Sequence, residues 1–257
     1  MRLNIPVKGN KKLAEIISRT DKDIELAELW KASNVMAIDR LGFNDHGPTH
    51  VKISANISLK ILRIFVAAGR VPNIVKDYHM TNEDAEVIVV LASLLHDIGH
   101  VVHREHHEQF SVQLAIPIIQ RLLRNVYDSS SLIILQGEIL HAIFSHTSGI
   151  VPHTLEAGIV KIADALDMER GRARIPFHAG SVNIHSVSAM AIDKVDIRPG
   201  SDKILEIEIR MSNSAGIYQI DDLLRERIAE SGLAKDISVI VQISGEERRI
   251  IEKRIEI

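Results

Sequence analysis

His96 and Asp97 stand side by side at the end of a strongly apolar segment, in the sequence LLHDIGH at residues 94–100. Imidazole nitrogens and carboxylate oxygens are natural ligands of divalent zinc, manganese, iron and nickel. Because a carboxylate has two oxygens, Asp97 could also bridge two ions. A histidine that ends a helix beside an exposed aspartate would give the same pair without a metal, so the pair alone leaves both interpretations open.

Other residues of the same two types occur in the same part of the chain. There are 13 histidines, most of them at residues 46–153, and no cysteine. His50 begins a predicted helix, His107 lies in HHEQFS, and His146 ends ILHAIFSH. Asp164 lies among apolar residues in IADALD, where a carboxylate is unfavourable unless it is paired or coordinated. Together these residues favour a metal site.

Taken in order, four donors resemble the defining pattern of the HD-domain metal-dependent phosphohydrolases: His50, His96, Asp97 and Asp164. The segment LLHDIGH, followed by His107 and by AIFSH at residues 142–146, is similar to the branch that holds two metals. That branch includes cyclic-dinucleotide phosphodiesterases of the HD-GYP type. The chain lacks the Gly-Tyr-Pro segment, and Thr147 follows His146 where that branch has a second histidine. We therefore do not expect cyclic-dinucleotide hydrolysis.

The resemblance implies a ligand set for each ion. The first ion would be held by His50, His96, Asp97 and Asp164. The second would be held by His107 and His146, with Asp97 as the bridge. The cofactor would be one or two divalent ions (manganese, iron, nickel, zinc, cobalt or magnesium) that activate water and neutralise phosphoryl charge. The resemblance implies a metal-dependent phosphohydrolase that cleaves a phosphate mono- or diester of a nucleotide.

Asp97, His100 and Lys161 are the catalytic candidates. His100 lies one turn beyond Asp97, where it would orient substrate phosphate or assist proton transfer. Lys161 lies one turn before Asp164 on the same face and is the preferred substrate contact. Other cations nearby are Lys52, Arg104, Arg170, Arg172 and Arg174, although the last three also fit a solvated helix end.

The spacing of the other histidines in this part of the chain does not fix their roles as clearly. His46 is either an additional ligand or plays no part. His103 and His106 either stack with His100 along one side or lie in a polar loop. His141 is five residues before His146, which points it away from the site and favours a structural role.

Two other functions fit the same ligand set. One is a di-iron oxygenase of the myo-inositol oxygenase type, which iron content and oxygen dependence would distinguish. The other is a non-catalytic nucleotide-binding sensor with the C-terminal part as its output module. Retention of every ligand position argues against the sensor, because a degenerate relative would lose ligands first.

The elements that position these residues change in type along the chain. Helical spacing of apolar residues predicts helices at residues 21–41, 50–68, 81–95, 105–127, 129–146 and 154–170. Thr81 and Asp84 form a capping-box signature. Alternating patterns then predict strands at residues 182–187, 191–197, 204–211, 237–244 and 249–257, with a helix at 220–230.

We thus expect an α+β protein. An all-helical HD-type domain at residues 1–175 precedes a small α+β domain at residues 176–257 with a dimerisation or regulatory role. The final strand leaves an edge that predicts a homodimer.

Composition excludes several classes of protein. With 46% hydrophobic and 25% charged residues the chain is typical of a globular protein. A net charge of −3 gives no reason to expect nucleic acid or an anionic membrane as a partner. The absence of cysteine excludes disulfides and thiolate metal sites. No signal peptide or membrane span is evident, so we expect a cytoplasmic protein. The partner implied by the resemblance is a small phosphate ester.

Overall fold

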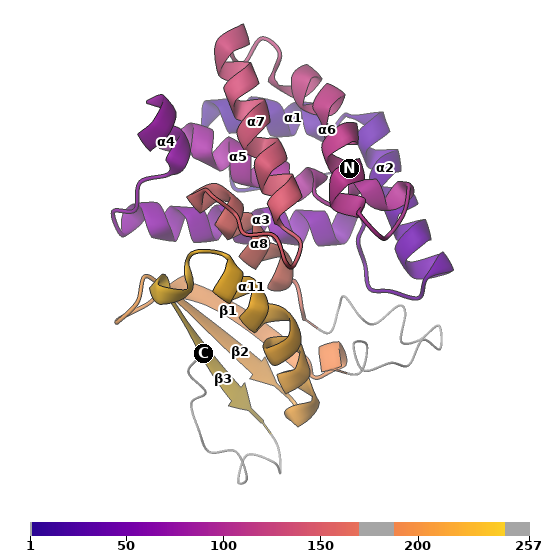
Figure 1. Ribbon diagram of the computed structural model, residues 1–257, viewed down its shortest axis with the longest axis vertical. Coiled ribbons are helices and arrows are strands. Elements are labelled where there is room, and N and C mark those ends of the chain that lie inside the picture. The colour runs from indigo at the N-terminus through magenta and orange to yellow at the C-terminus, as the bar shows by residue number, and fades with distance from the viewer. Residues whose placement is uncertain (1, 170–187, 245–257) are drawn as a thin grey trace.

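The computed structural model describes residues 2–169 and 188–244. Within these ranges, a helical part comes first and a small sheet with its own helices follows, as the α+β prediction states. Figure 1 shows the helical part above and the sheet below it, with helix α11 between the sheet and the viewer. The predicted strands at 182–187 and 249–257, the domain boundary at 175/176, and the edge on which the homodimer prediction rests lie outside the described residues.

The helices of the first part agree with most of the predicted ranges. Their bounds are α1 Lys11–Thr20, α2 Ile24–Asn34, α3 Pro48–Ala67, α4 Asn73–Tyr78, α5 Asn82–Leu95, α6 His107–Leu123, α7 Ser129–Ser145 and α8 Leu155–Ala165. A π-helical segment, η1 Val35–Arg40, continues α2, and a 3-10 helix, η2 Ile98–Val101, follows α5. Helices α1 and α4 were not predicted from the sequence.

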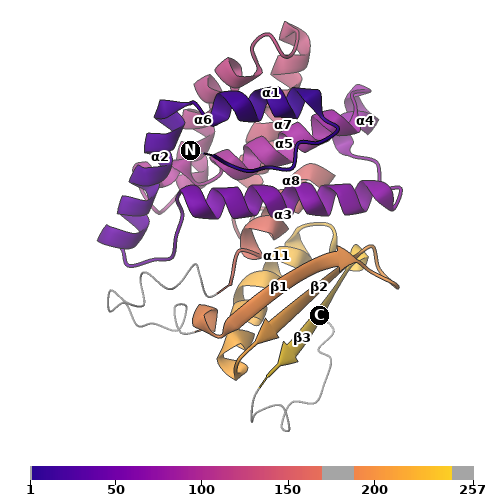
Figure 2. The ribbon, with the colours of Figure 1, turned by 180° about the vertical axis from the view of Figure 1, so that it is seen from behind.

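Helix α5 is the centre of the helical part. Its N-terminus has the predicted capping box, in which Thr81 and Asp84 satisfy each other's backbone N–H groups. Beyond the first turn its residues are apolar on almost every side, and α1, α3, α7 and α8 pack around them. Figure 2 shows α5 between α1 and α3 from behind. The Trp30 indole N–H donates to the Leu94 carbonyl at 2.8 Å, which fixes α2 at the C-terminal end of α5.

Several helices begin or end at the predicted donors. Helix α5 is followed by His96 and Asp97, α6 begins at His107, and α7 is followed by His146. Gly99 allows α6 to approach, because a Cβ on Gly99 would lie 2.0 Å from the His107 carbonyl oxygen. The glycine of LLHDIGH therefore brings His107 toward Asp97.

The C-terminal part holds a three-stranded sheet. The strands are β1 Ile192–Pro199, β2 Leu205–Met211 and β3 Ile237–Ile243, in the order β1-β2-β3. Strand β1 is antiparallel to β2, whereas β2 and β3 are parallel. A parallel pair needs a crossover, and here it contains a π-helical segment, η4 Gln219–Leu224, and helix α11 Arg225–Glu230. The predicted strands at 191–197, 204–211 and 237–244 and the helix at 220–230 are thus confirmed.

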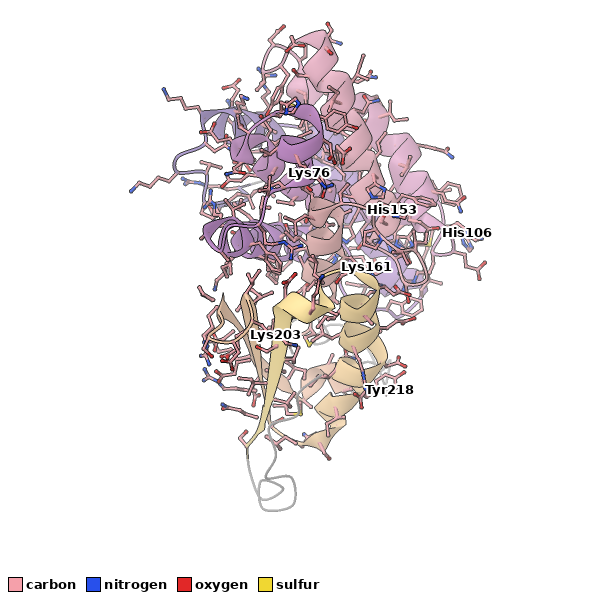
Figure 3. All side chains as sticks on the ribbon, turned by 60° about the vertical axis from the view of Figure 1, so that its left-hand side comes forward. Lys76, His106, His153, Lys161, Lys203 and Tyr218 are labelled. Atoms are coloured by element: carbon pink, nitrogen blue, oxygen red, sulfur yellow. The ribbon has the colours of Figure 1, made fainter. Side chains whose placement is uncertain are left out.

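The two parts meet where α11 packs on α8. Lys161 of α8 is fully buried, and its Nζ lies 2.6 Å from Glu230 Oε2. Gly158 permits the close contact, because a Cβ there would lie 2.5 Å from the Ser231 carbonyl oxygen. Figure 3 shows Lys161 where the helical and C-terminal parts join. None of the helices in residues 2–169 and 188–244 combines the length and apolar composition that crossing a lipid bilayer requires.

Candidate metal centre

One group of donors gathers around Asp97 Oδ2. The Nε2 atoms of His50, in the first turn of α3, and His96 lie 3.1 Å apart. Asp97 Oδ2 lies 3.3 Å from each of these nitrogens. Asp164 Oδ1, from α8, lies 3.2 Å from His50 Nε2 and 3.5 Å from His96 Nε2. Three helices thus bring together the four residues predicted for the first ion.

A second group gathers around the other oxygen of the same carboxylate. The Nε2 atoms of His107 and His146 lie 3.1 Å apart. Asp97 Oδ1 lies 3.4 Å from His107 Nε2 and 3.8 Å from His146 Nε2. Asp97 therefore stands between two pairs of imidazoles, with one oxygen toward each pair.

The other ring nitrogen of each histidine faces an oxygen that accepts a hydrogen bond. These Nδ1 contacts are His50 to Asp167 Oδ2 at 2.7 Å, His96 to the Ser93 carbonyl at 2.8 Å, His107 to the Arg104 carbonyl at 3.1 Å, and His146 to the Ile143 carbonyl at 2.6 Å. Because a carbonyl only accepts, Nδ1 carries the proton and the Nε2 of a neutral ring presents its lone pair. Such partners are typical of histidines that bind a metal through Nε2.

The donor chemistry fits a bound cation. Two neutral Nε2 atoms that both present lone pairs cannot hydrogen-bond each other, yet the Nε2 atoms of His107 and His146 face each other at 3.1 Å. Asp97 Oδ2 is buried and has no hydrogen-bond partner among the described residues. A divalent ion would use these lone pairs and offset the carboxylate charge. The clusters of histidine and aspartate could therefore hold metal ions.

Protonation states in the cluster agree with this chemistry. Burial lowers the pKa of His107 to about 4 and that of His146 well below its ordinary value. Burial alone would raise the pKa of Asp97, but the charge on His96 outweighs it and holds the pKa well below its usual range. Burial likewise opposes protonation of His96, yet the Asp97 carboxylate raises the pKa of His96 to about 9. Without a metal, the cluster attracts a proton to the place where a cation would stand.

His100 and His46 lie beside the second group. His100 Nε2 lies 3.5 Å from Asp97 Oδ1 and 3.2 Å from Arg104 Nη1, and its ring stacks on His107 with centroids 4.2 Å apart. The His46 ring lies 4.7 Å from the His100 ring. His46, Asp97 and His100 form a further group whose donor atoms are close enough to hold an ion. The structure thus places both histidines at the cluster.

Lys161 is not at the cluster, contrary to the role of substrate contact that its spacing suggested. Its Nζ donates to the carbonyls of Thr147 and Ile150, each at 2.7 Å, and pairs with Glu230. It does not line the cavity beside the donors. The sequence spacing identified the correct helix, but Lys161 Nζ is bound to these carbonyls and to Glu230 of α11 and is not directed at the donors.

Other histidines lie away from the donors. His106 is exposed at the start of α6, as Figure 3 shows, and His103 is exposed before it. His141 Nε2 accepts from the His153 backbone N–H at 3.0 Å, and the two rings stack. The structure supports the polar-loop interpretation of His103 and His106 and the structural role of His141.

A cavity of about 240 Å³ opens beside the donors. Asp97, His107, His146 and Asp164 line it. The C-terminal part also lines it, through Ala189, Gln219, Leu223 and Arg227. Among the cations predicted to be near the site, Arg104 lines the cavity, Lys52 does not, and Arg170, Arg172 and Arg174 lie outside the described residues.

Two residues of the site were missed from sequence. Asp167 accepts from His50, and its spacing of three from Asp164 was a usable signal because it places both near one helix end. Arg227 lies more than sixty residues beyond Asp164, in an amphipathic pattern typical of any surface helix. Nothing local indicated that Arg227 reaches the donors.

Comparisons with known proteins place the cluster within a family. The family model for the HD domain matches residues 45–169. The six predicted donors all fall within that range: His50, His96, Asp97, His107, His146 and Asp164. The chain is also 44% identical over 226 residues to the uncharacterized protein MJ1020 of Methanocaldococcus jannaschii, a match that covers 88% of this chain and 87% of that protein. The match is longer than the helical part, so the similarity includes some of the C-terminal part.

Proposed function

This chain belongs to the HD domain family, and from that premise we propose that it is a metal-dependent phosphohydrolase that cleaves a phosphate mono- or diester of a nucleotide. The observation that carries the proposal is the position of Asp97 between two pairs of imidazoles whose Nε2 lone pairs converge on its two oxygens. The neutral His107 and His146 rings cannot hydrogen-bond each other through Nε2, so this arrangement fits cations.

The proposal assigns one ligand set to each of two ions. The first set is His50, His96, Asp97 and Asp164, and the second is His107, His146 and Asp97. When bound, divalent ions lower the pKa of water toward about 7 and neutralise charge on phosphoryl oxygens. Asp97 fixes the two sets relative to each other because it belongs to both.

The surrounding residues orient the donors and the substrate. Asp167 holds the His50 ring through Nδ1, which keeps Nε2 directed at the site. Arg104 lines the cavity, donates to His100 and stacks on Phe43 at 4.9 Å from the ring centroid. A guanidinium held in this way is suited to binding phosphoryl oxygens. His100, between Arg104 and Asp97, is placed to orient the phosphate or to carry a proton.

The cavity supports a nucleotide as the substrate class. Phe43, Met168 and Leu223 line it together with the polar donors. Apolar side chains beside a phosphate site would pack against a base or sugar and exclude water from the reacting group.

The test begins with elemental analysis of untreated protein. Metal-free protein is then assayed against nucleotide mono- and diesters with Mn²⁺, Ni²⁺, Co²⁺ or Mg²⁺ added back. We expect bound divalent metal and metal-dependent release of phosphate or of a nucleoside monophosphate. Asp97→Asn, which keeps the shape but removes the charge, should lose both, whereas the exposed Asp202→Asn should retain both.

Three outcomes would contradict the proposal. Iron with oxygen consumption and no hydrolysis would favour the di-iron oxygenase. Nucleotide binding without turnover under every metal would favour the sensor. Undiminished turnover in Asp97→Asn would show that the cluster is not the reactive site.

A further inference from the structure

Arg227 of helix α11 reaches from the C-terminal part to two of the donors. Its Nη1 donates to the backbone carbonyl of His146 and lies 3.5 Å from Asp164 Oδ2. In the proposed function, Asp164 belongs to the first ion and His146 to the second. A single guanidinium therefore contacts one ligand from each set.

The two oxygens of the Asp164 carboxylate face different partners. Oδ1 lies toward His50 and His96, whereas Oδ2 lies toward Arg227. A hydrogen bond to Oδ2 leaves Oδ1 as the oxygen directed at the donor cluster. The carboxylate is thus held in one orientation.

The contact with His146 holds a residue of the second ligand set. His146 is held at its side chain and at its backbone, since its ring Nδ1 donates to the Ile143 carbonyl and its own carbonyl accepts from Arg227. Because α7 ends at Ser145, no further helical turn holds that carbonyl. Arg227 supplies the missing donor at the end of α7.

Buried contacts hold α11 where Arg227 can act. Glu230 lies one turn after Arg227, pairs with the fully buried Lys161 and also accepts from the Gly149 backbone N–H at 2.9 Å. Lys161 in turn binds the carbonyls of Thr147 and Ile150. These contacts connect the segment that follows His146 to both α8 and α11. They therefore hold the Arg227 guanidinium close to the His146 carbonyl.

We propose that Arg227 is a positioning residue through which the C-terminal part completes the metal centre, by holding Asp164 and His146 in place. The inference rests on the metal centre of the proposed function. It implies that the C-terminal part is required for full metal affinity in the helical part. Loss of such an outer-shell partner typically weakens metal binding by about 10–100-fold.

The test is a titration of the metal-free protein, with the whole chain present, in which Mn²⁺ binding is measured by calorimetry. We expect Arg227→Gln to bind Mn²⁺ about 10–100-fold more weakly than the wild type. Arg227→Lys should fall between the two, because lysine keeps the positive charge but its side chain is shorter than that of arginine. Arg225→Gln is the matched control, since Arg225 is exposed on the same helix and pairs with Asp221; it should bind as the wild type does.

Far-UV circular dichroism and thermal unfolding of the metal-free proteins accompany the titration. If Arg227→Gln unfolds at a lower temperature than Arg225→Gln, Arg227→Lys decides, because its long stem preserves packing against α8. Wild-type Mn²⁺ affinity in Arg227→Gln, or in a stably folded Arg227→Lys, would overturn the inference. A wild-type protein that binds no Mn²⁺ or other divalent metal would instead refute the proposed function itself.

Discussion

Replacing Lys161 with methionine tests the role that the structure gives this residue. The side chain is fully buried, and its Nζ contacts two carbonyls at 2.7 Å and Glu230 Oε2 at 2.6 Å. Methionine preserves most of the stem but leaves the carbonyls of Thr147 and Ile150 without this donor. Lys161→Met should therefore weaken the join between α8 and α11 and lower the free energy of unfolding.

The size of the loss follows from the burial of the two partners. Removing one partner of a buried ion pair costs about 3–5 kcal/mol. Glu230 is 20% exposed and keeps its bond from the Gly149 N–H, so part of its charge stays solvated. Burial also lowers the pKa of Lys161, which shows that desolvation offsets some of the attraction. We therefore expect a loss near the lower end, about 3 kcal/mol, or a fall in unfolding temperature of about 6–12 °C.

The assay is urea unfolding of the metal-free proteins, followed by far-UV circular dichroism. Lys235→Met is the control, because Lys235 is exposed and should change stability by less than about 0.5 kcal/mol. A loss in Lys161→Met below about 1 kcal/mol, the value for an exposed pair, would refute the reasoning. Wild-type stability with a raised KM for the phosphate ester would restore the substrate contact that the spacing suggested.

Three further outcomes are expected. Removing metal with a chelator should lower the unfolding temperature, and Mn²⁺ at a hundred times its dissociation constant should restore about 2.7 kcal/mol; equal unfolding curves with and without metal would contradict this. Gly99→Ala should destabilise the protein by about 1–3 kcal/mol and weaken Mn²⁺ binding, because the added Cβ meets the His107 carbonyl at 2.0 Å. Gly137→Ala, a helical glycine with open space around it, should be neutral or stabilising in the same assays. Although burial alone would raise the pKa of Asp84, hydrogen bonds from Lys12 and Tyr127 lower it below its ordinary value of 3.8. The stability that Asp84 contributes is thus present above that pH and is lost as pH falls through the folded-state pKa. Urea midpoints of wild type and Asp84→Asn should therefore converge in acid, and a constant difference would refute the assignment.

Much of the local structure was determined by the sequence itself. The capping box at Thr81, the apolar faces of the long helices and the alternation in β2 depend on neighbours within a few residues, so their patterns are visible without coordinates. Helix α4 escaped because six residues, Asn73–Tyr78, carry too little periodicity. Helix α1 was not predicted, although Asn10 accepts from the Leu13 N–H as its N-cap.

The types and order of the donors were likewise readable, because imidazole and carboxylate are the common side-chain ligands of divalent transition metals in a chain without cysteine. The resemblance already implied that the donors divide into two sets that share Asp97. Their convergence depends on tertiary structure, since helices α3, α5, α6, α7 and α8 must pack before their ends meet. Tertiary structure also decided that Lys161 lies away from the donors and that Arg227 contacts them. Each depends on the packing of α11 against α8, a contact between residues far apart in the chain for which neither local sequence holds a signal.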